Sequence, residues 1–169
     1  LITIPWELEV PTLALASLAA VTPESHFEVC IVDTLRERLV FNEPTDLVGI
    51  SASTPSIYVA YALADAYRSK GVKVVLGGHH ATAMPEEALE HADAVVCGEG
   101  EGSWQLILDQ MLTDPSQVSG TYNEPPPALA DLPQPRIDLM KINRYQSFYY
   151  PAIASRGCPM SCSFCFAKR

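Results

Sequence analysis

Short apolar runs alternate with helix-like stretches along this chain as far as residue 112. The runs are continuous, rich in β-branched residues and too short for helices: Leu1–Ile4, Phe27–Val32, Leu47–Ser51, Lys73–Leu76 and Ala94–Cys97. Strands that are buried on both faces of a parallel sheet have this pattern. The alternation predicts the α/β class, with a doubly wound, flavodoxin-like parallel sheet of five strands and crossover helices on both faces.

The stretches between these runs carry helix signals. Thr54-Pro55 supplies an N-cap and a proline at the first helical position, apolar residues follow at helical spacing, and Gly71 ends the helix. The other predicted helices are Thr12–Ala20, Pro85–His91 and Glu101–Leu112.

Composition limits the classes of partner. With 169 residues, of which 48% are hydrophobic, the chain can bury the core of one ordinary domain. The net charge of -9 argues against nucleic acid, and no apolar run is long enough for a membrane span. Cys30 and Cys97 lie in apolar runs and are predicted to be buried, inert thiols, which favours a reducing, cytoplasmic location.

Residues 113–150 differ from the rest. Seven of the 14 prolines fall between Pro115 and Pro151, and a segment of this composition is extended and semi-rigid. We therefore expect a domain at 1–112, a linker at 113–150, and the truncated start of a second domain at 151–169. The absence of Met at Leu1 and the little that follows residue 165 suggest that the chain is a fragment.

Three predicted strands end in small or glycine-rich segments, and the carboxyl ends of parallel strands are where open α/β sheets bind ligands. The residues that we predict to contact a ligand there are Ser51, Ser53, Thr54, Gly77, Gly78, His79, Gly98 and Glu99. Glycines that merely turn the chain are the alternative at any single strand end. No phosphate-binding loop is present, and the two acids of Gly98-Glu99-Gly100-Glu101 argue against a dinucleotide.

Three cysteines near the end of the chain, Cys158, Cys162 and Cys165, are separated by three residues and then by two. Three thiolates in one loop can hold three irons of a [4Fe–4S] cluster and leave the fourth iron open. A zinc site is the alternative, but zinc takes four ligands and no matching second pair of cysteines exists.

This cysteine spacing, with Phe164 before the last cysteine, resembles the signature of the radical S-adenosylmethionine (SAM) enzymes. The resemblance implies that the open iron binds SAM, that Phe164 packs beside the adenine of SAM, and that the motif loop follows the first strand of a partial barrel, here Pro151-Ala152-Ile153-Ala154.

The order of the earlier elements resembles the cobalamin-binding domain that precedes the barrel in cobalamin-dependent radical SAM enzymes. The matching segments, within about residues 1–112, are 47–51, 74–82, 85–88 and 92–101. The resemblance implies that the serine and glycine loops line a channel for the nucleotide tail of cobalamin, between Ser51–Thr54 and Gly77–Gly78.

One departure concerns cobalt. In methionine-synthase-like domains the loop after the first strand carries a cobalt-binding histidine, whereas the loop here, Pro5 to Pro11, has none. His26 and His91 precede strands and are predicted to be surface residues. His79 either contacts the cofactor or simply completes its loop, and for His80 the second role is favoured. We expect cobalamin to bind with its own base detached and with no histidine in its place.

The leading hypothesis is a fragment of a cobalamin-dependent radical SAM methyltransferase, inactive by itself and with no catalytic residue of its own. The parent enzyme would need an electron donor such as flavodoxin or ferredoxin. Its substrate, a small molecule or a peptide, cannot be identified from this sequence, because the residues that would hold it are expected in the barrel. An anaerobic cyclase or ring-rearranging enzyme of the same architecture is one alternative. A non-catalytic, flavodoxin-like ligand-binding module with a structural metal site is the other.

Overall fold

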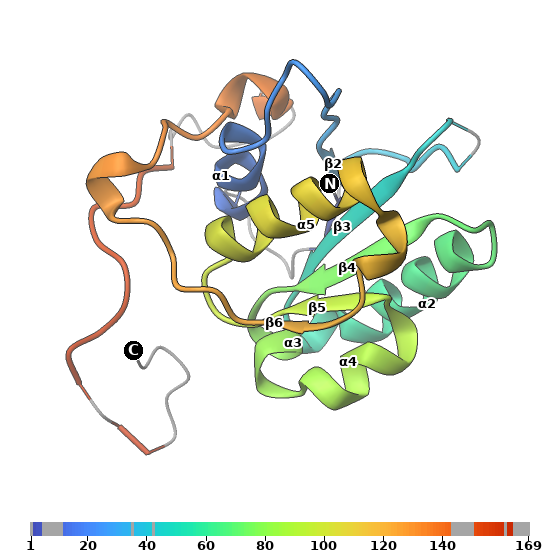
Figure 1. Ribbon diagram of the computed structural model, residues 1–169. Coiled ribbons are helices and arrows are strands. Elements are labelled where there is room, and N and C mark those ends of the chain that lie inside the picture. The colour runs from blue at the N-terminus through green and yellow to red at the C-terminus, as the bar shows by residue number, and fades with distance from the viewer. Residues whose placement is uncertain are drawn as a thin grey trace.

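The computed structural model of the chain describes residues 2–4, 12–34, 36–41, 43–142, 151–160 and 162–163. Six parallel strands form one sheet in the order β2-β1-β3-β4-β5-β6 (Figure 1). The strands are β1 (Ile2–Ile4), β2 (Val32–Asp33), β3 (Leu47–Ala52), β4 (Lys73–Gly77), β5 (Ala94–Val96) and β6 (Gly120–Tyr122). The first five follow the flavodoxin-like order, in which the chain reverses direction across the sheet between β1 and β3.

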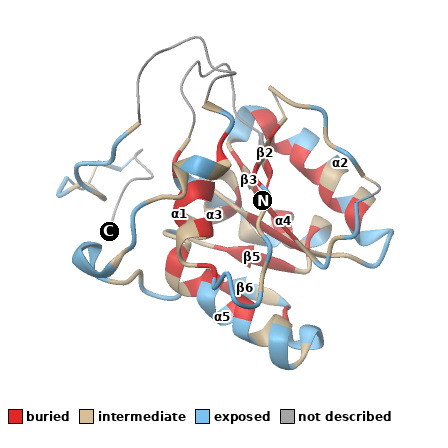
Figure 2. Ribbon diagram, turned by 90° about the horizontal axis from the view of Figure 1, so that it is seen from above, coloured by how far each residue is buried: buried red, intermediate tan, exposed pale blue. Residues whose placement is uncertain are grey.

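Helices cover both faces of the sheet, which confirms the doubly wound α/β class (Figures 1 and 2). On one face lie α1 (Ala14–Ala20) and α5 (Glu101–Thr113), and on the other lie α2 (Ile57–Arg68), α3 (His79–Ala83) and α4 (Pro85–His91). The short helix α3 was not among the sequence predictions, because five residues after Gly78 are too few to show helical periodicity.

Alternate residues of each strand face opposite layers. Val48, Ile50, Val74, Leu76 and Val95 pack under α2, α3 and α4, whereas Val75, Ala94 and Val96 face α5. Odd-numbered positions of β3 and β4 therefore point to the layer of α1 and α5. This alternation decides which strand residues reach the cavity described below.

The sheet has one strand more than the sequence predicted, and that strand comes from the proline-rich segment. β6 pairs with β5. Val118, just before this strand, and Tyr122, its last residue, are buried in the core beneath α5. Gly-Thr-Tyr is too short and too polar to read as a strand from the sequence, because only its edge position in the sheet gives it a partner.

The segment beyond β6 lies against the domain as far as residue 142. The backbone N–H of Arg136 donates to the carbonyl of Ala16 in α1 (2.9 Å), and Met140 is buried against that helix. Arg136 also pairs with the exposed Glu24, and Lys141 pairs with Glu37, whose side chain is nearly buried. Packing on α1, rather than a core of its own, orders this part of the proline-rich segment.

Two local predictions are corrected by the structure. The strand expected over Phe27–Val32 begins only at Val32, so Cys30 precedes it and is exposed instead of buried. The turn before α2 is capped by Ser53, whose backbone N–H donates to Ser56 Oγ (3.3 Å), rather than by Thr54. Gly71 does follow α2 as predicted, with a φ of 79° that favours glycine.

Candidate functional site

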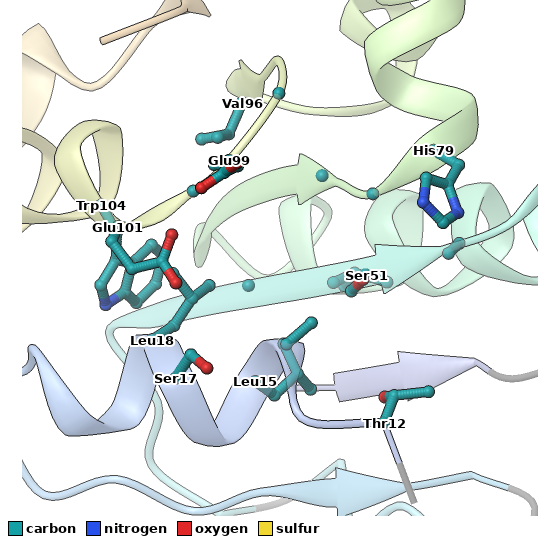
Figure 3. A pocket seen from close by; sticks show the side chains of 18 of the residues that line it. Thr12, Leu15, Ser17, Leu18, Ser51, His79, Val96, Glu99, Glu101 and Trp104 are labelled. Atoms are coloured by element: carbon teal, nitrogen blue, oxygen red, sulfur yellow. The ribbon is translucent and has the colours of Figure 1, made fainter. Parts of the chain in front are cut away.

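A cavity of about 740 Å³ lies at the carboxyl ends of β3, β4 and β5, between the sheet and the layer of α1 and α5. Figure 3 shows His79 and Thr12 toward one end of this cavity, Trp104 and Ser17 toward the other, and Ser51 between them. Its place is the one at which open α/β sheets bind ligands, outside the carboxyl ends of the strands near the reversal of strand order.

The floor of the cavity is a patch of sheet in which three of the strand positions carry small residues, Gly49, Ser51 and Gly77. Gly49 pairs with Val75 across β3 and β4, and Ser51 pairs with Gly77 at the next position of the same face. A Cβ built on Gly77 would lie 3.8 Å from its nearest neighbour, in Val96, so a Cβ fits at this position at ordinary van der Waals distance. Small residues at adjacent positions on one face leave a channel where the opposite face has valine, isoleucine and leucine.

The walls are apolar and held in place. Leu15 and Leu18 of α1 and Trp104 of α5 line the cavity. The Trp104 indole N–H donates to Thr22 Oγ1 (2.9 Å), and that hydroxyl donates to the Leu18 carbonyl (2.8 Å). This buried chain of hydrogen bonds ties α5 to the end of α1, so the indole ring has a fixed position against the cavity.

Ser17 is the polar exception on this wall. Its side chain lines the cavity, the residue is 6% exposed, and its hydroxyl has no hydrogen-bond partner among the described residues. A buried hydroxyl without a partner costs free energy, about 1–3 kcal/mol. A ligand with a polar atom at this end of the cavity would remove that cost.

The predicted contact residues line this one cavity, with the exception of Thr54. Thr54 Oγ1 lies 3.1 Å from His80 Nδ1 and thereby links η1 (Thr54–Ser56) to α3. Gly78 lines the cavity, but the chain itself also demands glycine there, since φ is 93° and a Cβ would lie 2.6 Å from the Ala52 carbonyl oxygen. The turn-forming explanation therefore holds for Gly78 and not for Gly77.

The four histidines lie in different surroundings. His79 is exposed at the cavity, whereas His80 is not among the lining residues and its Nε2 lies 3.5 Å from Glu87. His91 stacks on Tyr61, with ring centroids 4.1 Å apart, and His26 is exposed. The loop from Pro5 to Pro11, where methionine-synthase-like domains carry the cobalt-binding histidine, lies outside the described residues.

Two carboxylates and one guanidinium form a charged cluster on the cavity wall. Arg156 Nη1 lies 2.6 Å from Glu101 Oε1 and 3.2 Å from Glu99 Oε2. Burial by itself lowers the pKa of Arg156, but its hydrogen bonds to Glu101 and Glu99 outweigh this and leave the pKa raised. The side chain therefore stays cationic at any pH at which the fold persists.

The cysteine motif is described only in part. Cys158 and Cys162 are free, half-buried thiols, whereas Cys165 and Phe164 lie outside the described residues. Within the described ranges, no three His, Cys, Asp or Glu side chains are grouped so that they could hold a metal ion. Cys97 is half-buried, and burial raises the pKa of its thiol.

Several cavity residues were not predicted as contacts: Leu15, Ser17, Leu18, Gly49, Trp104 and Arg156. Gly49 did carry a signal, because a glycine inside a strand often indicates a site where another group approaches the backbone closely. The helix residues carried no such signal, since a leucine, serine or tryptophan on an amphipathic helix is usually a core or surface residue. Arg156, outside the helices, carried none either.

In the described part of the chain, no helix is both long enough and apolar enough to cross a bilayer.

Comparison with known proteins agrees with this geometry. Residues 1–108 match the model of the B12-binding domain. The chain is 32% identical over 157 residues to the bacteriochlorophyllide d C-8(2)-methyltransferase of Chlorobaculum tepidum, covering 90% of this chain and 35% of that protein. It is 34% identical over 195 residues to an uncharacterized methyltransferase of Pyrococcus horikoshii, covering 94% and 42%.

An anaerobic magnesium-protoporphyrin IX monomethyl ester cyclase of Rubrivivax gelatinosus is 32% identical over 165 residues, covering 79% of this chain and 29% of that protein. The chain thus spans about a third of the length of the curated relatives that it matches. No solved structure gives a significant match. The match of the family model over most of the chain shows that this protein belongs to the family of B12-binding domains.

Proposed function

We propose that the cavity binds the nucleotide tail of cobalamin, and that the chain is the cofactor-binding part of a cobalamin-dependent radical SAM methyltransferase. The family match supports cobalamin, and the names of the Chlorobaculum and Pyrococcus relatives support methyl transfer. The spacing of Cys158, Cys162 and Cys165 supports a [4Fe–4S] cluster that binds SAM.

The observation that carries the proposal is the small-residue floor of the cavity together with the unpartnered hydroxyl above it. The floor of Gly49, Ser51 and Gly77 and the walls of Leu15, Leu18 and Trp104 suit the flat, largely apolar benzimidazole base of this tail. Such a ligand is anchored by a few polar contacts in a mostly apolar site, and Ser17 and Ser51 supply hydroxyls for this purpose. The residues present therefore fit the group.

In this role the protein binds, orients and shields, while the cofactors supply the chemistry. Bound cobalamin supplies a transferable methyl group, and the cluster with SAM supplies the radical that prepares the substrate carbon. Leu15, Leu18 and Trp104 exclude water from the tail, and Ser51 and Ser53 hold the rim of the channel. His79, exposed at the strand ends, would contact the bound cofactor.

A second candidate is the cyclase function named for the Rubrivivax relative. Both candidates use the same cofactor cavity, so this site does not separate them. The residues that would choose the substrate lie outside the matched B12-binding domain, and an electron donor such as flavodoxin or ferredoxin is proposed for either.

The test is equilibrium binding of methylcobalamin and hydroxocobalamin to the purified chain under reducing, anaerobic conditions. We expect one cobalamin per chain and a visible spectrum that shifts to the form in which the benzimidazole base is detached from cobalt. Absence of binding, with the chain folded by circular dichroism, would overturn the proposal and favour a module for another ligand.

The cluster is tested separately by iron and sulfide analysis after anaerobic reconstitution. In the full-length protein we expect about four irons per chain, with most of this iron lost when Cys158, Cys162 and Cys165 are all replaced by Ala. The matched control replaces Cys30 and Cys97, which lie elsewhere, and should keep its iron. Equal iron content in the triple variant and the control would contradict the cluster assignment.

A further inference from the structure

The first cluster cysteine lies close, along the chain, to the charged cluster on the cavity wall. Arg156 precedes Cys158 by two residues, and its guanidinium contacts Glu101 at 2.6 Å and Glu99 at 3.2 Å. The side chains of Arg156 and Glu101 are 16% and 5% exposed, so this contact is mostly withdrawn from water. By contrast, the ion pair of Arg136 with Glu24 farther up the same segment joins side chains that are 31% and 74% exposed.

Burial gives this contact its importance. A surface ion pair contributes little to stability, whereas loss of one partner from a buried pair is strongly destabilising because a charge is left uncompensated. Glu101 is the nearly buried member, and as the first residue of α5 it is also stabilised by the helix dipole. Arg156 is the cation that faces both carboxylates.

The same segment forms part of the cavity. Ile153, Arg156 and Gly157 line it, as do Glu99 and Glu101 on the opposite side of the ion pair. The ion pair therefore joins the loop after β5 to the chain segment that leads into the cysteine motif, at the wall of the cofactor cavity. A displacement of Arg156 would open that wall and move Cys158 with it.

We propose, on the basis of the function proposed above, that Arg156 is a positioning residue that clamps the cysteine-bearing segment to Glu99 and Glu101 and so completes the wall of the cobalamin cavity. The position of Cys158 and the occupancy of the cavity are then coupled. Cobalamin binds more tightly when the clamp is closed, and by reciprocity the clamp opens less often when cobalamin is bound.

Trypsin offers a direct test, because it cuts after Arg156 only when that side chain can leave its carboxylates and enter the protease. In the native chain we expect slow cleavage of the Arg156–Gly157 bond. Replacing both carboxylates, Glu99→Gln with Glu101→Gln, should accelerate this cleavage at least tenfold. The matched control, Glu86→Gln with Glu90→Gln, removes the same charge from exposed positions of α4 and should leave the rate unchanged.

Cleavage at Lys70–Gly71, in the exposed turn after α2 and outside the clamped segment, is the internal control and should proceed at the same rate in all folded variants. If the double variant unfolds, Glu99→Gln by itself carries the test, because Glu99 is the more exposed carboxylate, and about threefold acceleration is expected. Equal cleavage rates at Arg156 in the native and variant chains would overturn the clamp.

The coupling is measured by titration with methylcobalamin. Arg156→Gln should raise the Kd by about three- to tenfold, with Arg156→Lys between it and the native chain, and cobalamin should slow cleavage at Arg156 in the native chain. Equal Kd values would overturn the coupling while the proposed function stands. If no chain binds cobalamin, the proposed function and the coupling both fail, whereas the cleavage rates still decide whether the clamp exists.

Discussion

The two faces of the sheet are built from alternate residues of the same strands, yet only one of them is filled. Under α2, α3 and α4 the strands present Val48, Ile50 and Leu76 to small helix residues such as Ala60 and Ala64, and this core is closed. Under α1 and α5 the intervening positions include Gly49, Ser51 and Gly77 beside Val75, and a cavity remains at the carboxyl ends of the strands. A one-residue alternation thus separates the structural face from the ligand face, so stability and binding should respond to different substitutions.

The largest difference between the effect on binding and the effect on stability is expected from substitutions at two neighbouring glycines. Gly77→Val places a side chain on the small-residue floor, where a Cβ meets nothing closer than 3.8 Å, so the fold should persist. We expect methylcobalamin affinity to fall about 100-fold, roughly 2.7 kcal/mol, in an equilibrium titration.

Gly78→Ala is the matched control and should behave in the opposite way. Its Cβ would lie 2.6 Å from the Ala52 carbonyl oxygen at a φ of 93°, so the free energy of unfolding should fall by about 1–3 kcal/mol. Normal affinity in Gly77→Val would place the ligand elsewhere.

Overfilling the closed face should have the converse effect. Ala60 of α2 is fully buried against the sheet, so Ala60→Leu forces extra carbons into a packed core and should lower the free energy of unfolding by about 1–3 kcal/mol. Denaturant unfolding measures this loss. The Kd for methylcobalamin of the folded protein should not change, and a tenfold weaker Kd would show that the two faces are not independent.

Ser17→Ala should alter stability and binding in opposite directions. Without ligand, the variant no longer buries an unpartnered hydroxyl, so it should be as stable as the native chain or slightly more stable. With methylcobalamin, it lacks one hydrogen bond, and the Kd should rise about three- to tenfold, which corresponds to about 0.6–1.4 kcal/mol. Unchanged affinity would mean that no polar atom of the ligand reaches this hydroxyl.

The smallest effect is expected at His79, the exposed imidazole at the cavity. We expect the electron paramagnetic resonance spectrum of the cob(II)alamin form to lack nitrogen superhyperfine splitting, and His79→Ala to change the Kd by less than about threefold, or 0.7 kcal/mol. Splitting that disappears in His79→Ala would identify this histidine as the cobalt ligand. His80→Ala is the control, because His80 contacts Thr54 and Glu87 instead of the cavity.

Much of this arrangement could be predicted from the sequence, since buried parallel strands and glycine-rich strand ends are local patterns. These patterns placed Ser51, Gly77 and Gly98 at one site, and the cavity brings them together. β6 and Ser17 could not be predicted in this way. β6 has no apolar run and exists because β5 offers it an edge, and Ser17 differs from any other helix serine only through the empty space beside it.

Amide hydrogen exchange with and without methylcobalamin tests most directly whether the ligand occupies the face of α1 and α5. We expect added protection in residues 14–18, 49–54, 77–79 and 98–104, which border the cavity, and none in α2 or α4. Protection spread equally over both faces, or confined to α2 and α4, would contradict the assignment of the cavity as the cobalamin site.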